Sequence, residues 1–311
     1  MQPPLCSPRC AAPAVQPPLC SPRCAALFSG FCSIVQSPFQ GDRLMQKTLL
    51  ALAILSFAAA ASAAPDSQET PLHPIKDGRY TVTTGYEHSN IESGSKINSD
   101  GFILRGRADI PLAQQHAIRA ELGYARRSFD AKASGVTVVD GGKIDEINLY
   151  AGYLYSPSGF KQGGLRVGGG LSYSYTAGNA RAHRTVHAPN IMDNNSSTLY
   201  LKAQVEYEQD LGGGWSITPW GEAQVSLRDR VETKWSQVYP HVPDETHKRS
   251  SYGISLGVDA QKQFTPNLAL TFGPYYHYDH SKTSAYDHAG VHFNSSTSHA
   301  HSFGIRAGLR F

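Results

Sequence analysis

Histidine is the residue whose spacing in this sequence most readily suggests chemistry. The stretch 277–301 reads HYDHSKTSAYDHAGVHFNSSTSHAH and holds six of the thirteen histidines. Imidazole is a common metal ligand and changes charge near neutral pH. A divalent metal site is therefore considered, with ligands from His288, His292, His299 and His301. No spacing here matches a recognised zinc motif, so we prefer a polar surface loop whose rings charge at mildly acidic pH, and expect no cofactor.

Acidic residues stand beside two of these histidines, which is a pairing that hydrolases use. The candidates are Asp279, His280, Asp287 and His288. A general base needs an orienting partner within hydrogen-bond reach, and spacing alone does not supply one. Enzymatic activity therefore stays an alternative that the sequence leans against.

All five cysteines lie near the start of the chain, in a Pro-rich segment. The string QPPLCSPRCAA occurs twice, over residues 2–12 and 16–26. Paired C-x3-C spacing suggests a zinc site. The repeats contain neither histidine nor an acidic residue to complete it. The favoured interpretation is a spurious or disordered leader over residues 1–44, with no role in the fold.

Residues 45–63 have the features of a secretory signal peptide. Met45-Gln46-Lys47 supplies a positive start, an apolar run follows, and Ala61-Ser62-Ala63 is a small-residue cleavage site. Residues 64–78 then form a polar lead-in. Removing the four basic and one acidic residues before position 64 from totals of 28 and 25 leaves 24 of each. Zero net charge gives no reason to expect a nucleic-acid partner.

The elements that must position the histidines follow from residue 79 onward. Apolar and polar residues alternate in segment after segment, which predicts strands with one apolar and one polar face. In lipid only a helix or a closed barrel satisfies every backbone group, so repeated amphipathic strands predict a transmembrane antiparallel up-and-down β-barrel. The ten expected strands are 79–88, 101–112, 116–129, 143–155, 164–176, 198–209, 215–230, 251–262, 266–278 and 301–311.

The predicted connections alternate in length. Those after even strands are short, spanning 112–115, 156–163, 210–214 and 263–266. Those after odd strands are long, spanning 89–100, 130–142, 177–197, 231–250 and 279–300. Short periplasmic turns and long extracellular loops are typical of outer-membrane barrels. Most histidines therefore fall at the extracellular end.

The last strand and the aromatic residues support a membrane location. Phe303, Ile305, Ala307, Leu309 and Phe311 alternate to the final residue. This ending resembles the closing strand of bacterial outer-membrane β-barrel proteins, of small porin-like or omptin size. Outward aromatic residues gather near both interfaces, as girdles do: Tyr80, Tyr155, Tyr207, Trp215 and Phe311 at one, and Tyr86, Tyr124, Tyr252, Tyr276 and Phe303 at the other.

The resemblance carries expectations about location and partners. It implies a Gram-negative outer membrane, assembly by the barrel-assembly machinery through the strand ending at Phe311, and contact with membrane lipid and lipopolysaccharide. We expect a monomer.

The inner face of the predicted barrel carries both signs of charge. The expected lumen network comprises Arg105, Arg107, Arg119, Glu121, Glu146, Lys202, Glu206, Glu222, Arg228, Asp259 and Arg306. A barrel of this size is filled largely by its own side chains, and a balanced mixture favours a structural polar core. A selective pore would carry a constriction of one sign. The preferred function is a structural or surface-interaction role through His-rich extracellular loops. A narrow porin-like channel and an omptin-like or lipid-modifying enzyme at the rim are the alternatives.

Overall fold

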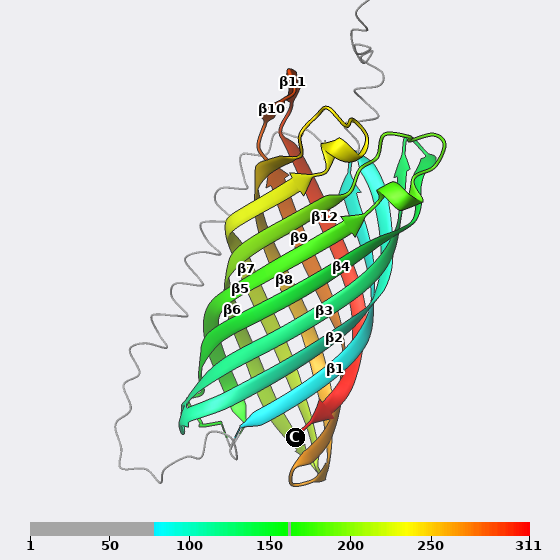
Figure 1. Ribbon diagram of the computed structural model, residues 1–311. Coiled ribbons are helices and arrows are strands. Elements are labelled where there is room, and N and C mark those ends of the chain that lie inside the picture. Colours follow the sequence, from blue (N-terminus) through cyan, green and yellow to red (C-terminus); the bar gives the residue numbers. More distant parts are fainter. Residues whose placement is uncertain (1–77, 161–162) are drawn as a thin grey trace, which may run out of the picture.

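The computed structural model describes residues 78–160 and 163–311 and folds them into one closed antiparallel barrel (Figure 1). The leader, the signal peptide and all but the last residue of the lead-in predicted above lie outside the described residues. The barrel strands are β1 (Arg79–Ser93), β2 (Ser95–Ala113), β3 (His116–Ala133), β4 (Val136–Tyr155), β5 (Gly164–Asn179), β6 (Asn194–Gly212), β7 (Trp215–Thr233), β8 (Glu245–Thr265), β9 (Leu268–Thr283) and β12 (Ser296–Arg310).

Each strand pairs with its neighbours in the sequence, and β12 closes the barrel by pairing with β1. Val82 pairs with Leu309 in that last ladder. Two short strands, β10 (Tyr286–His288) and β11 (Val291–Phe293), form a separate hairpin. The predicted fold class and strand number are therefore confirmed. No helix within the described ranges has the length and apolar character needed to cross a membrane.

Period-two alternation gives the wall two different faces. The outer face is apolar and open, with Leu122 at 58% and Ile305 at 66% exposure. The inner face is polar and closed, with Arg119 at 1%. Successive side chains of a strand point to opposite faces, so residues next to each other in sequence enter different environments. Apolar residues thus face lipid and charged residues face the lumen.

The two ends of the barrel differ in their connections, as predicted. At the end that carries Phe311, which we name the turn end, β2–β3, β6–β7 and β8–β9 are joined by two-residue turns. At the opposite end, named the loop end, stand loop 3 (180–193), loop 4 (234–244) and loop 5 (284–295).

Two of the predicted long loops are mostly strand. Residues 89–100 and 130–142 extend β1–β2 and β3–β4 into hairpins that turn at Gly94, with a φ of 38°, and at Ser134-Gly135, with φ values of 51° and 80°. Left-handed backbone of this kind suits glycine and makes the turns tight. The polar residues there had suggested loops because the outer face of such an extension does not meet lipid, and the apolar residues that still alternate, such as Phe129 and Ala131, face inward instead.

The structure modifies the predicted aromatic girdle at one position. Tyr86, Tyr207, Trp215 and Phe303 are more than 40% exposed on the outer face. Tyr252, in contrast, is only 3% exposed and stacks on His280, with ring centroids 4.7 Å apart. It has outward parity, but neighbouring side chains cover it beside a register shift between Val225 and Asp229 of β7. The prediction that Tyr252 faces lipid is therefore wrong.

We expect Leu122→Arg to destabilise the folded barrel by about 2–4 kcal/mol, because it places a charge inside the hydrocarbon band. The matched control is Ser128→Arg, which lies on the same face of β3 beyond Tyr124 and should cost less than about 1 kcal/mol. Urea unfolding in lipid vesicles measures both. Equal losses at the two positions would contradict the assigned membrane band.

Candidate functional site

The turn half of the lumen is crossed by a ladder of ion-paired side chains. Arg119 of β3 is its centre, and its guanidinium donates to both carboxylate oxygens of Asp109 at 2.6 and 2.7 Å. It also donates to Glu206 at 3.0 Å and to Gln204 at 3.1 Å. These bidentate, charge-assisted bonds join β2, β3 and β6 across the interior. A guanidinium that reaches three strands is a cross-link of the barrel.

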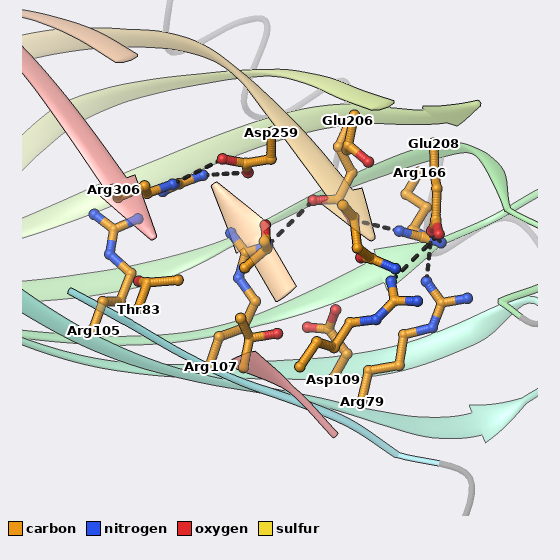
Figure 2. A pocket seen from close by; sticks show the side chains of 15 residues that line it. Arg79, Thr83, Arg105, Arg107, Asp109, Arg166, Glu206, Glu208, Asp259 and Arg306 are labelled. Carbon is orange, nitrogen blue, oxygen red and sulfur yellow. Dashed lines mark hydrogen bonds and ion pairs between the residues drawn. The ribbon is translucent and has the colours of Figure 1, made fainter. Parts of the chain in front are cut away.

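A second layer lies against this ladder (Figure 2). Arg166 bonds Glu206 at 3.0 Å and also bonds Glu208, and Arg79 bonds Glu208 at 2.8 Å. Arg310 of β12 lies 3.3 Å from Glu208. Arg166 was absent from the predicted network, although alternation with outward Leu165 and Val167 identifies it as inward. Opposite charges therefore fill the turn half.

The middle of the lumen repeats the pattern with other residues. Lys202 bonds Glu222 at 2.8 Å and lies 3.5 Å from Glu121. Nearby, Arg127 donates to Glu146 at 2.6 Å and to Glu87 at 2.9 Å. The aromatic rings of Tyr150, Trp220 and Tyr275 also face inward here. The strand alternation that predicts outward Leu149 and Ala151 also makes Tyr150 an inward residue, although the predicted lumen network contained charged residues alone.

The structure places ten of the eleven predicted lumen charges on the inner face, and the exception is Arg228. Arg228 is exposed, and its neighbour Asp229 is buried and bonds Arg249 at 2.9 Å. The register shifts between Val225 and Asp229, which exchanges the two faces beyond that point. A bulge of this kind re-aims side chains. The inward assignment of Arg228 is therefore wrong.

Ser255, His277 and Asp279 form a chain of contacts in the lumen, nearer the loop end than the Arg119 ladder. Ser255 is 2.7 Å from Nδ1 of His277, whose other ring nitrogen contacts Asp279. These are the residue types of a nucleophilic triad. The cavity that they line measures about 180 Å³, whereas small-molecule sites usually span about 300–1,000 Å³. The geometry therefore supports a buried polar chain that organises the lumen.

The predicted hydrolase residues are not brought together. Asp279 lines the lumen cavity, while adjacent His280 contacts Tyr252 on the outward side of β9. In loop 5, Asp287 pairs with His292 at 2.7 Å and His288 pairs with Glu245. Adjacent residues on a strand cannot share a face, so no common site forms.

The four predicted metal ligands also separate. His288 and His292 lie on the β10–β11 hairpin, whereas His299 and His301 lie on β12 in the barrel wall. Nδ1 of His299 is 2.8 Å from the Tyr278 hydroxyl, and Nδ1 of His301 is 2.7 Å from that of Tyr276. Across residues 78–160 and 163–311, no group of three or more His, Cys, Asp or Glu residues is arranged to hold a metal ion. The predicted metal site is not assembled in this structure.

The loop end of the barrel contains a small apolar core. Phe129, Ala131 and Val139 from the β3–β4 extension are at most 5% exposed, and Ile191 of loop 3 packs against them. Thr185 of loop 3 donates through its hydroxyl to the Thr137 carbonyl at 2.9 Å. Burial of these side chains holds loop 3 against the inner wall. The apolar core therefore covers one side of the mouth.

Loops 3 and 4 are held together by a reciprocal contact. The Asp193 amide donates to the side-chain oxygen of Gln237 at 3.0 Å, and the Gln237 amide donates back to Asp193 at 3.0 Å. In loop 4 the Ser236 hydroxyl donates to Asp244 at 2.7 Å and lowers the pKa of that carboxyl. A carboxyl whose pKa is lower in the folded state than in the unfolded state stabilises the fold at neutral pH. This stabilisation is lost as the pH falls through the folded-state pKa.

Aromatic stacking joins loop 5 to loop 4. Trp235 of loop 4 is 5% exposed and stacks on His288, with centroids 5.4 Å apart. The Phe293 ring lies 5.4 Å from the Trp235 ring, measured between centroids. The Tyr286 ring stacks on His247, an inward residue of β8, with centroids 4.6 Å apart. Contacts thus link loops 3, 4 and 5 and the β3–β4 tip in series at the loop end, and we name this group the loop platform; the β10–β11 hairpin projects beyond the rest of it (Figure 1).

Comparison with known proteins gives one family match. The model of the family described as outer membrane protein OpcA matches residues 77–311. No curated protein matches the chain in sequence.

Solved structures are similar at low identity. The outer membrane protease OmpT of Escherichia coli is 13% identical with a TM-score of 0.48, covering 79% of this chain and 99% of that chain. The translocator domain of the autotransporter NalP of Neisseria meningitidis is 13% identical with a TM-score of 0.42, covering 86% and 98%. Ail of Yersinia pestis is 14% identical with a TM-score of 0.29, covering 75% and 99%.

We expect Arg119→Met to destabilise the barrel by about 3–5 kcal/mol, because it leaves buried Asp109 without its ion-pair partner and removes one of the partners of Glu206. Arg126→Met is the matched control: its side chain is 56% exposed and lies 3.7 Å from Asp145, so it should cost at most about 1 kcal/mol. Urea unfolding reports both. A similarly small loss of stability in both variants would show that the Arg119 ion pairs do not stabilise the barrel.

We expect Trp235→Ala to loosen loops 4 and 5 while the strands stay folded. Truncating a buried tryptophan typically costs about 3–5 kcal/mol of stability. We expect this loss to be confined to the loop platform. Limited proteolysis should cut 234–244 and 284–295 faster, with an unchanged heat-modifiable band. Val186→Ala is the control, because Val186 is 89% exposed. Unchanged cleavage in the tryptophan variant would contradict the packing described above.

Proposed function

The chain belongs to the OpcA family of outer membrane proteins, and on that basis we propose that it presents the loop platform to molecules outside the cell. The barrel anchors the platform in the outer membrane. The contacts that hold loops 3, 4 and 5 together at the loop end carry this proposal. A packed surface binds with less loss of conformational entropy than separate mobile loops do, which favours recognition.

The ion pairs that cross the lumen favour an interaction role over a channel. The Arg119 ladder fills the turn half, and the apolar core around Phe129 covers part of the loop end. Solute passage requires a continuous path, and charge pairs that cross-link the interior obstruct it. A narrow porin-like channel is the second candidate only if these contacts open.

Histidine side chains are exposed on the proposed surface. His292 has a side chain 61% exposed on the β10–β11 hairpin, and His187 is exposed on loop 3. We propose that loops 3 and 5 contact the partner through these polar aromatic rings.

The route to the membrane is also proposed. Residues 45–63 would act as a cleaved signal peptide, and the strand ending at Phe311 would engage the barrel-assembly machinery. Lipid and lipopolysaccharide would surround a monomeric barrel. The start of the mature protein, sequenced from the heat-modifiable outer-membrane band, tests the cleavage. A start other than Ala64 would contradict it.

A display experiment tests the interaction role. Bacteria displaying the full chain should be retained on at least one member of an array of extracellular-matrix proteins, glycans and lipopolysaccharides, above the level of the empty host. Replacing 286–293 by a glycine-serine turn should reduce retention at least tenfold. Lengthening the Gly213-Gly214 turn at the opposite end is the control and should leave retention unchanged.

Planar-bilayer recording separates the two candidates. The purified barrel should give no stepwise conductance, because the lumen ladder stays closed. Regular conductance steps, together with no retention on the array, would contradict the interaction role and support the channel.

A further inference from the structure

Four cations lie together on the outer wall of β7, β8 and β9, at the loop end. Their side chains are exposed and have neither an ion pair nor a hydrogen bond to any residue that the structure describes. Their neighbours Asp229 and Arg249 pair with each other in the lumen, so the adjacent positions on β7 and β8 face outward. We name the four cations the outer basic patch: Arg228, Arg230, Lys248 and Lys282.

The strand register places these cations close together. Arg230 is directly opposite Lys248, and Lys282 is opposite Ser250, two residues further along β8. On one face of a sheet, directly opposite Cβ atoms are about 4.5–5.5 Å apart and diagonal neighbours about 7–8 Å apart. Like charges directly opposite each other are destabilising. A negatively charged group between these side chains would therefore remove a repulsion that the bare wall contains.

Other outward cations of the loop end have carboxylate neighbours. Lys96 is directly opposite Glu92 across β1 and β2, and Arg126 lies 3.7 Å from Asp145 across β3 and β4. Beside the outer basic patch, the next outward carboxylate of β7 is Glu232, which a lysine of loop 4 already holds at 2.6 Å. The β7–β9 wall thus carries four positive charges that no carboxylate of the described residues pairs.

The outer basic patch begins where the lipid-facing band ends. Leu227 is 54% exposed and directly precedes Arg228 on β7. Arg228 is in register with Leu199 of β6, and Leu199 is in register with Tyr173 of β5, an exposed aromatic residue of the loop-end girdle. Outward tyrosines of this kind lie at the depth of the lipid headgroups. The cations are therefore at the depth where headgroup phosphates are found.

We propose that the outer basic patch binds the phosphate of an outer-leaflet lipid, whose acyl chains lie along exposed Leu227 and Leu256. Two guanidinium groups can hold phosphate oxygens in bidentate geometry, and two ammonium groups add point charges. The headgroup chemistry that fits is a phosphorylated glycolipid of the lipopolysaccharide class. The proposal deepens the expected contact with lipopolysaccharide, and it rests on the outer-membrane location and not on the loop platform.

Native mass spectrometry of the barrel, purified from outer membranes into nonionic detergent, tests the site by counting bound lipid. The probes are lipid A with two phosphates and the same lipid with both phosphates removed. We expect the phosphorylated lipid to bind at least about tenfold more tightly, because only it can form charge-assisted bonds to the cations. Equal binding of the two lipids would overturn the proposal.

A double variant locates the binding on the wall. Arg230→Gln combined with Lys248→Gln should weaken binding of the phosphorylated lipid at least about tenfold, with an unchanged heat-modifiable band. The control combines Lys96→Gln with Lys143→Gln, which removes the same charge from exposed positions on β2 and β4, and it should change binding by less than about twofold. No weakening in the patch variant, or equal weakening in both double variants, would contradict a site at the patch.

Two competitors identify the source of the phosphate. Inorganic phosphate and the deacylated, phosphorylated headgroup should each compete at least about tenfold less well than the intact lipid, because they bury no acyl chain against the wall. Competition as strong as that of the intact lipid would assign the patch to a soluble anion and overturn the lipid. The patch variant should keep its retention on the array, so the lipid site and the interaction role are measured separately.

Discussion

Backbone hydrogen bonding in lipid is the constraint on which the rest of this structure depends. A strand that crosses hydrocarbon must pair on both edges, and β12 meets that requirement by pairing with β1 from Thr81–Arg310 through to Glu92–His299. Closure fixes which face of each strand meets lipid and which meets the lumen. Charged residues are tolerated in the wall only because closure gives them an interior in which to find one another.

The interior that results is an electrostatic core. Arg119, buried to 1% exposure, bonds two carboxylates from two strands, and Lys202 does the same one layer further in. Such a core differs from an apolar one because each member depends on specific partners. The loop platform is built on the opposite principle: aromatic and aliphatic side chains such as Trp235 and Phe129 hold it through burial.

Much of the barrel was predictable because its signal has a short period. Alternation located all ten strands, and closure then placed most inward charges correctly. The failures have local physical causes. Arg228 and Tyr252 lie next to a register shift, which residue propensities do not predict. The β1–β2 and β3–β4 extensions looked like loops because their outer faces do not meet lipid and are therefore polar.

The candidate site was less accessible to sequence reasoning. Composition drew attention to histidine, but the alternation of faces along a strand sends these rings to different places. His277 faces the lumen, whereas His299 and His301 bond tyrosines on the outer wall. Which carboxylates a lumen arginine meets, as Arg166 meets Glu206 and Glu208, is a property of packing in three dimensions and has no signature along the chain.

The strand extensions have a consequence for reach. From Tyr124 at the membrane interface, β3 runs nine more residues to Ala133, and a strand tilted about 40° climbs roughly 2.5 Å per residue. The wall itself therefore raises the β3–β4 tip roughly 20 Å above the interface by the same estimate. A macromolecule arriving from outside therefore meets the β3–β4 tip before it meets the membrane surface, and it meets a paired strand wall there.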